Sequence, residues 1–185
     1  TTKSLWRPSG RSARPFTRAS SEVTEVASLL ERLKETVGQK IVIQAPDEMG
    51  RSSLRQYALA IGDFNPLYSD RDFALAHGLR DVMAPPTLIC DTWQYVDSDM
   101  DDRGDLIGRG PIRELEGLRA GNEYEFFRPI HPDDVISAHW TVKDVYEKTG
   151  RTGSLVFQVI QTTFYNQADE LLARNTETMF YRPEA

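Results

Sequence analysis

The sequence predicts an α+β protein in which helical segments precede a long antiparallel sheet. In the first half of the chain, hydrophobic residues recur at every third or fourth position, which is typical of amphipathic helices. From Pro111 onward the period changes to two, and alternating segments are separated by short turns. Helices followed by such a meander indicate an α+β arrangement rather than alternating βαβ units.

The composition fits one domain with an extension, since the chain has 185 residues. Residues 1–21 are rich in Ser, Arg, Pro and Thr and are predicted to form a flexible N-terminal arm. Residues 22–185 are then a single domain. The net charge of -6 argues against a nucleic-acid partner, which requires clustered basic residues.

The sequence gives no sign of a metal, a cofactor or a membrane span. Cys90 is the only cysteine, and the three histidines are too far apart in the sequence for metal-ligand spacing. No apolar run approaches the roughly 18 residues that a transmembrane helix needs. We therefore expect a cytoplasmic protein that binds no metal and no cofactor.

The first elements are predicted as helix, strand, helix. Ser21 is a suitable N-cap for a helix that ends at Gly38. Residues 40–45 alternate weakly and predict the first strand. Ser52 or Ser53 is the expected cap of a second helix, which stops at Gly62.

Two further helices are expected before the meander. Asp70 can cap a short helix that ends at Gly78. Pro85 and Pro86 then suit the first turn of a largely buried helix over residues 87–96, because proline is tolerated there. An acidic, glycine-containing loop should follow over residues 97–110.

The second half predicts strands at residues 112–119, 122–129, 135–146, 154–165 and 171–181. In the third of these, alternation places Ile136, Ala138, Trp140 and Val142 on one face. Residues 148–153 and 166–169 have the composition of hairpin turns.

The most informative segment follows the second helix. Asp63, Asn65 and Pro66 are followed by Tyr68, and farther on by the run Ala84-Pro85-Pro86-Thr87. This pattern resembles the MaoC-like enoyl-thioester hydratases and dehydratases, and in particular their N-terminal, half-degenerate type. The resemblance covers roughly residues 33–182. It implies a hot-dog fold, in which a curved antiparallel sheet wraps around a central helix at residues 87–96.

The resemblance also shows what has changed. Catalytic members of the family carry D-x-N-P-x-H, and here Tyr68 stands in the place of the histidine. In those members the Asp and His hold the attacking water, and a backbone N–H at the start of the central helix serves the oxyanion. Pro85 and Pro86 cannot donate there, since proline has no N–H.

The candidate catalytic residues are therefore Asp63, Tyr68 and Asn65. The candidate substrate-binding residues are Pro85, Pro86, Thr87 and Trp93. Structural interpretations remain open beside these. Asp63 can be a turn residue that accepts from the N–H of Asn65 or Leu67, and Tyr68 a packed aromatic with a bonded hydroxyl. His131, in a Pro-flanked turn, is read as structural.

Three functions follow from the resemblance. The first is a subunit of an enoyl-CoA hydratase or 3-hydroxyacyl-thioester dehydratase, which supplies the acyl-binding half while a partner with an intact motif supplies the chemistry. The second is an autonomous homodimeric hydratase that uses Asp63 and Tyr68. The third is a non-catalytic acyl-thioester binding module. In each case the expected ligand is an acyl-CoA or acyl-carrier-protein thioester, and a homodimer or heterodimer is expected.

Overall fold

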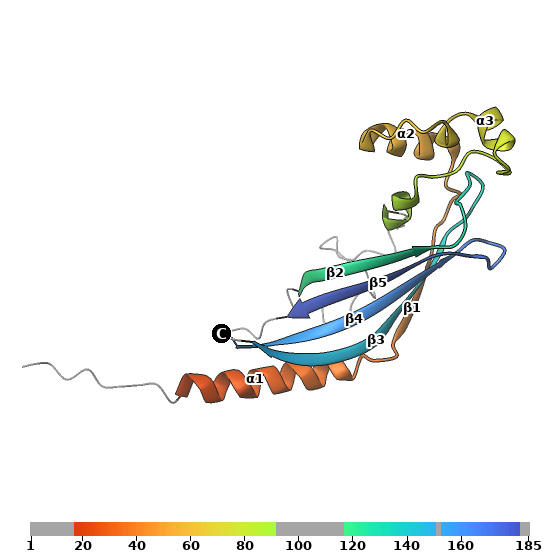
Figure 1. Cartoon of the computed structure of the whole chain (residues 1–185). Coiled ribbons are helices and arrows are strands. Elements are labelled where there is room, and N and C mark those ends of the chain that lie inside the picture. Colours follow the sequence, from red (N-terminus) through yellow and green to blue (C-terminus); the bar gives the residue numbers. More distant parts are fainter. Residues whose placement is uncertain (1–16, 92–116, 151–152, 182–185) are drawn as a thin grey trace, which may run out of the picture.

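The structure is built on one antiparallel sheet of five strands in the order β1-β3-β4-β5-β2 (Figure 1). The computed structural model describes residues 17–91, 117–150 and 153–181. The strands are β1 (Lys40–Gln44), β2 (Gly117–Phe126), β3 (Ser137–Gly150), β4 (Gly153–Tyr165) and β5 (Leu171–Tyr181). The predicted α+β class is confirmed, because every neighbouring pair in this sheet is antiparallel and the helices lie outside it.

The prediction of two separate strands at 112–119 and 122–129 is wrong. A single strand, β2, pairs with β5 from Gly117 to Phe126, and its register shifts between Arg119 and Gly121. A bulge of this kind inserts one residue and reverses the phase of the alternation, so that one strand has the sequence pattern of two. Residues 112–116 lie outside the described residues.

One face of the sheet is buried. The prediction for the third strand is confirmed, since Ile136, Ala138, Trp140 and Val142 are all buried. Along β4 the buried residues are those at even positions from 156 to 164, while the odd positions are half-buried. The hairpin between β3 and β4 is tighter than the predicted turn at 148–153, because Gly150 already pairs with Gly153.

Helix α1 (Thr17–Lys34) covers one end of this face and lies along β3 in Figure 1. It begins before Ser21, so the predicted N-cap lies inside the helix. Its residues Val26, Leu29 and Leu33 pack against a cluster of strand residues. The strand residues of this α1 cluster are Trp140, Val142, Val145, Val156, Ile160 and Tyr181.

A polar contact fixes the chain after α1 to the sheet. Gln158 is fully buried on β4, and its Nε2 donates to Thr36 Oγ1 at 3.3 Å. Its Oε1 accepts from the hydroxyl of Tyr181 at 2.9 Å. The buried carboxamide is therefore bonded through both of its polar atoms, as an amide removed from water requires.

The other end of the buried face carries α2 (Arg51–Ile61), α3 (Arg71–Ala76) and two 3₁₀ helices, η1 (Pro66–Tyr68) and η2 (Pro86–Asp91). Gly50, rather than Ser52 or Ser53, occupies the N-cap of α2. Gly62 ends α2 with φ 72°, in the left-handed region that glycine tolerates, as predicted. The carboxylate of Asp70 accepts from the Phe73 N–H at 3.0 Å and caps α3, which is also as predicted.

The segment expected as the central helix is present in part. Residues 86–91 form the 3₁₀ helix η2 rather than an α-helix, and residues 92–96 lie outside the described residues. Leu88 and Ile89 are buried in the same cluster as Ala138 and Phe164 of the sheet. The segment after the two prolines therefore packs on the sheet face, as the prediction requires. Among the described residues, no helix is long and apolar enough to cross a lipid bilayer.

We expect the packing of α1 to contribute strongly to stability. Leu33 is fully buried in the α1 cluster. Replacing it with alanine should lower the free energy of unfolding by about 2–5 kcal/mol, the usual cost of a buried Leu→Ala change. Chemical denaturation measures this cost. Leu59→Ala, at an α2 position that is 57% exposed, is the matched control and should change stability by less than about 1 kcal/mol. Equal effects would contradict the packing of α1.

Candidate functional site

The loop after α2 is organised by carboxylate and amide oxygens that accept from nearby backbone N–H groups. The N–H of Asp63 donates to the Ala58 carbonyl at 2.9 Å, which closes the helix end. Asp63 Oδ1 accepts from the N–H of Asn65 at 3.1 Å, and Asn65 Oδ1 accepts from the N–H of Leu67 at 3.1 Å. Asp63 and Asn65 therefore hold two successive turns, and Pro66 begins η1.

Tyr68 lies beneath this loop and is buried. Burial raises its pKa above the ordinary value of 10.0, and the negative charge of Asp63 and a hydrogen bond between the two side chains raise the pKa further. The phenol is therefore protonated at neutral pH. In this position Tyr68 is a hydrogen-bond donor, and it cannot take a proton from water.

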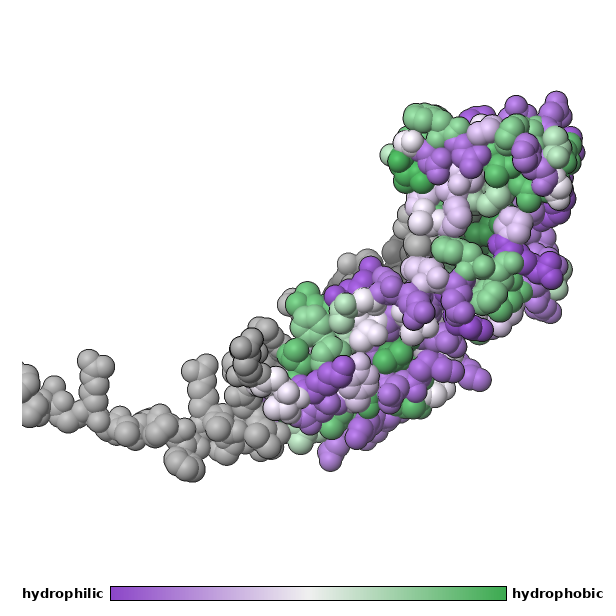
Figure 2. Space-filling model, in the orientation of Figure 1, coloured by the Kyte–Doolittle hydropathy of each residue, from purple (hydrophilic) through white to green (hydrophobic). Residues whose placement is uncertain are grey.

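The surface around the loop is apolar and exposed. Phe64, between Asp63 and Asn65, is 77% exposed, and Leu59 and Ile61 at the end of α2 are also exposed. Figure 2 shows hydrophobic residues at the surface of the part of the molecule formed by α2 and α3. Asp63 itself is exposed, so its carboxylate stands at the edge of this apolar surface.

The double proline lies between the loop and the sheet. Pro85 is fully buried, and its carbonyl accepts from the Leu88 N–H at 2.9 Å as η2 begins. The hydroxyl of Tyr57 donates to Oγ1 of Thr87 at 3.1 Å, which ties α2 to η2. Trp93 lies outside the described residues.

A cavity of about 310 Å³ opens beside η2, between the chain before it and the ends of β2 and β5. Its lining is almost entirely apolar: Leu79, Met83, Ala84, Pro86, Phe126, Phe127, Arg128, Pro129, Ile130, Leu172 and Ala173. Of the predicted site residues only Pro86 lines it, and the described lining includes none of Asp63, Asn65 and Tyr68.

Sequence reasoning missed most of this cavity. One signal was available in the adjacent pair Phe126 and Phe127, where two aromatic residues at the end of β2 break the alternation. Both remain exposed, at 48% and 46%, although they border an apolar cavity. Arg128 beside them forms an ion pair with Glu170 at 3.2 Å, so the rim is charged.

Backbone contacts connect the loop to the cavity wall. The N–H of Met83 donates to the Leu67 carbonyl at 3.0 Å, and the N–H of Ala84 donates to the Ile130 carbonyl at 2.8 Å. Met83 and Ala84 both line the cavity. A change in the loop is therefore transmitted to the wall through a single peptide segment.

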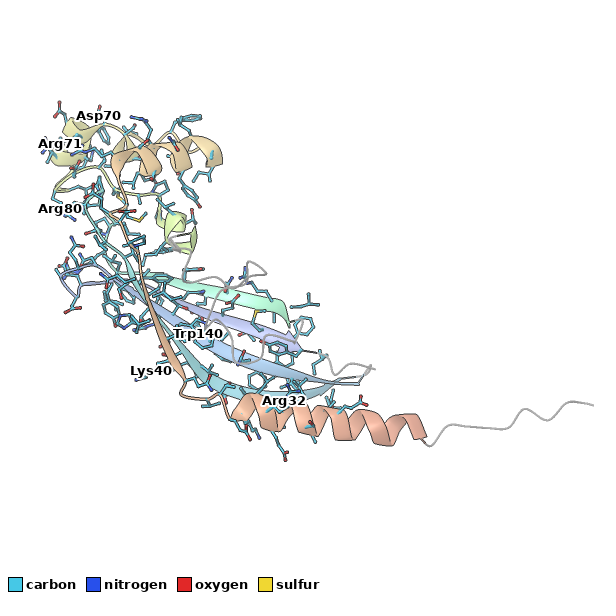
Figure 3. All side chains as sticks on the ribbon, turned by 180° about the vertical axis from the view of Figure 1, so that it is seen from behind. Arg32, Lys40, Asp70, Arg71, Arg80 and Trp140 are labelled. Carbon is cyan, nitrogen blue, oxygen red and sulfur yellow. The ribbon has the colours of Figure 1, made fainter. Side chains whose placement is uncertain are left out.

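A buried polar cluster supports the turn at the base of this region. Asp134, 1% exposed, accepts from Arg80 at 2.9 Å, from the His131 N–H at 2.7 Å and from Asn166 at 3.3 Å. His131 Nδ1 donates to the Val82 carbonyl at 2.9 Å, which fixes its tautomer. The side chain of Arg80 approaches the cluster from the α3 end, where Figure 3 labels it. These contacts agree with the structural reading of His131.

No metal centre emerges from the described residues, since no three His, Cys, Asp or Glu side chains among them come close enough to hold an ion.

Structural similarity defines the fold. The chain is similar to a chain of the ChsH1-ChsH2 complex from Mycobacterium tuberculosis, with a TM-score of 0.68 and 21% identity over 88% of this chain and 94% of that one. It is also similar to a chain of the HadBC (3R-hydroxyacyl-ACP dehydratase) complex from the same organism, with a TM-score of 0.56 and 20% identity over 77% and 96%. The fold is the hot-dog fold of hydratases and dehydratases.

The family follows from the sequence comparisons. Residues 35–175 match the family described as "FAS1-like, dehydratase domain region". The chain is also 43% identical over 155 residues to a UPF0336 protein of Parafrankia sp. (strain EAN1pec), which covers 82% of this chain and 95% of that protein. The chain belongs to this family of MaoC-like dehydratases, as its Asp63-Asn65-Pro66 pattern indicated.

The contact between Tyr68 and Asp63 is testable by titration. Tyrosinate absorbance should show a group with pKa above 10.0 that is lost in Tyr68→Phe. Asp63→Asn should lower the pKa of Tyr68 by removing a charge, while burial, the larger cause, keeps it above 10.0. The raised pKa of Tyr181 comes from its own burial and from Glu177, so the Asp63 variant should leave it unchanged.

The same titration should affect stability. Because the folded state holds the phenolic proton of Tyr68 more tightly than the unfolded state, the contribution to stability is complete below pH 10.0 and is lost as the pH rises through the folded pKa. Wild-type protein should therefore lose stability above pH 10 more steeply than Tyr68→Phe. Parallel stability profiles for the two proteins would show that Tyr68 titrates normally.

Proposed function

We propose that this chain is a subunit of an enoyl-CoA hydratase or 3-hydroxyacyl-thioester dehydratase, in which it supplies the acyl-binding hot-dog half. It does so as a single domain that follows an N-terminal arm. A partner chain with an intact D-x-N-P-x-H motif supplies the proton transfers. The substrate is an acyl-CoA or acyl-carrier-protein thioester.

The observation that carries the proposal is the buried phenol of Tyr68, which stands where catalytic members have a histidine and whose pKa is raised by burial and by Asp63. Hydration of an enoyl thioester needs an acceptor for the proton of the attacking water. A protonated phenol is not such an acceptor, and Asp63 is the one carboxylate of the motif. The Asn65 N–H already occupies one position on that carboxylate. What is left of the motif orders the backbone.

The oxyanion side of the reaction is also weakened. A thioester enolate needs preorganised donors at the start of the central helix, and loss of one such donor typically costs about 10²–10³ in rate. Pro85 and Pro86 provide none there, and Thr87 Oγ1 already contacts Tyr57. Proton transfer and oxyanion stabilisation are thus both weakened in this chain, which favours a role in substrate binding.

The surfaces favour a partner. The apolar cavity has no polar catalytic group of the loop in its described lining, so a complete active site needs residues from elsewhere. Phe64, Leu59 and Ile61 expose hydrophobic surface next to Asp63, where a second subunit would cover it. The two structural relatives described above are both found in complexes of two different chains.

The autonomous homodimer using Asp63 and Tyr68 is the less favoured alternative, because Tyr68 is a buried phenol in place of the histidine and Asp63 already accepts from the Asn65 N–H. A non-catalytic acyl-binding module shares the cavity and the altered motif with our proposal. It differs from the proposal in that no partner would produce turnover.

The decisive experiment measures hydration of crotonyl-CoA and longer trans-2-enoyl-CoA thioesters by loss of the enoyl absorbance. The purified chain should show only the background rate. Co-expression with a MaoC-like chain that carries the intact motif should give a stable complex and a rate at least about 100-fold above background, the lower range for a positioned acid–base group.

Two outcomes would contradict the proposal. Robust turnover by the chain alone, lost in Asp63→Asn, would favour the autonomous homodimer. Tight acyl-CoA binding with no turnover beside any intact MaoC-like chain of the same organism would favour the binding module. Replacing the partner's motif histidine with alanine is the control, because it should remove activity without dissolving the complex.

The cavity makes a separate prediction. Ala173 is buried in its wall, so Ala173→Leu should fill part of the space and weaken binding of long acyl-CoA at least about tenfold, with little effect on acetyl-CoA. Overpacking should also cost about 1–3 kcal/mol of stability, which thermal unfolding checks. Ala168→Leu, in the exposed turn between β4 and β5, is the matched control and should preserve the affinity for both thioesters. Equal loss for short and long chains would place the acyl group elsewhere.

A further inference from the structure

Two buried side-chain atoms of β5, Arg174 Nε and Asn175 Oδ1, have no hydrogen-bond partner among the described residues, and the second lies on the buried face of the sheet. Asn175 on β5 is 8% exposed, and its side-chain carbonyl Oδ1 accepts no hydrogen bond. By contrast, the other buried carboxamide on this face, Gln158, is bonded through both polar atoms. An unsatisfied buried carbonyl costs free energy, and one that persists in a folded protein calls for a partner that arrives from outside the fold.

The register of the strands places Asn175 one row beyond the residues that line the cavity. Adjacent residues across the sheet form rows on the buried face. One row consists of Ala138, Phe164, Ala173 and Phe126, and its last two members line the cavity. The next row consists of Trp140, Thr162, Asn175 and Tyr124. Asn175 is two residues along β5 from Ala173, a separation of about 7 Å.

The row of Asn175 is more polar than the row that borders the cavity. Thr162 is buried at 4% exposure beside Asn175. Trp140 is the β3 member of the row, and Ile41 of β1 pairs with it. In Figure 3, Trp140 lies between α1 and the η2 end of the sheet. A molecule that extends from the cavity along the sheet therefore meets a carbonyl oxygen after an apolar stretch.

The direction of entry follows from exposure. Phe126, Phe127 and Arg128 at the rim are all substantially exposed, so the charged, hydrated part of a ligand belongs there. Asn175 lies on the buried side, where the far end of an acyl chain would lie. This argument rests on the proposed function, since it takes the ligand to be an acyl thioester.

We infer that the chain binds acyl thioesters whose tail carries a hydroxyl group, and that Asn175 Oδ1 accepts the hydrogen bond from this hydroxyl. Asn175 is then a specificity-determining residue of the acyl site and has no part in proton transfer. An unsubstituted acyl chain would leave the oxygen unpaired, whereas an oxygenated one would satisfy it.

Two parts of a thioester can offer the donor, a tail hydroxyl or an amide N–H of the pantetheine arm. The pantetheine amides are common to all substrates, and the tail hydroxyl is not. The two sources therefore give different results when a plain acyl-CoA and a hydroxylated acyl-CoA are compared in the same variant.

The test measures binding of dodecanoyl-CoA and of its 6-, 8- and 10-hydroxy derivatives by calorimetry, with the full chain and its partner where the complex is stable. Wild-type protein should bind at least one hydroxylated thioester about tenfold more tightly than dodecanoyl-CoA. Asn175→Leu should abolish this preference and should preserve or improve the affinity for dodecanoyl-CoA. Asn122→Leu, at an exposed position of β2, is the matched control and should retain the preference.

Each contrary result has its own meaning. Binding of dodecanoyl-CoA without any preference for a hydroxyl in wild-type protein overturns the inference and leaves the proposed function standing. That result does not depend on the folding of any variant. Equal weakening of all thioesters in Asn175→Leu would assign the donor to pantetheine, against the inference. Failure of every thioester to bind overturns the inference and the proposed function together.

Discussion

The structure depends on burying a single face of a five-stranded sheet. Every buried residue of β4 lies on that face, and both hydrophobic clusters include residues from it. The helices α1 and α2 are therefore not two layers, since they cover opposite ends of one surface. The side-chain carboxamide of Gln158 lies within this surface. It is tolerated there because both of its polar atoms form hydrogen bonds, one with Thr36 and one with Tyr181. The opposite face carries half-buried aromatics such as Tyr146 and Phe157, stacked at 5.3 Å.

The loop after α2 shows that the side chains of its Asp-x-Asn-Pro motif have structural roles. Asp63 and Asn65 accept backbone N–H groups, and these bonds shape the turn whether or not a histidine follows. Their presence therefore has a local structural reason. The side chain at the histidine position makes none of these backbone contacts, so a phenol can occupy it. In this chain the pKa of that phenol is raised by its burial and by the negative charge of Asp63.

Local signals in the sequence predicted what local forces determine. The end of α2 at Gly62, the Asp70 cap and the buried residues of β3 each depend on a few neighbouring residues, and each was predicted correctly. The bulge in β2 was missed because it reverses the alternation within one strand. The cavity was missed for a different reason. Its walls come from residues 79–86, 126–130 and 172–173, which only the pairing of β2 with β5 and the packing of η2 bring together.

The separation of the two hydrophobic clusters along the sheet has a consequence for motion. The α1 cluster and the cluster around η2 share no residue, and each is complete at its own end of the strands. Helix α1 can therefore undergo local opening while the walls of the cavity stay in place. In hydrogen-exchange terms the domain should contain two cooperative units joined by β3, β4 and β5, so that fraying at one end need not release a ligand held at the other.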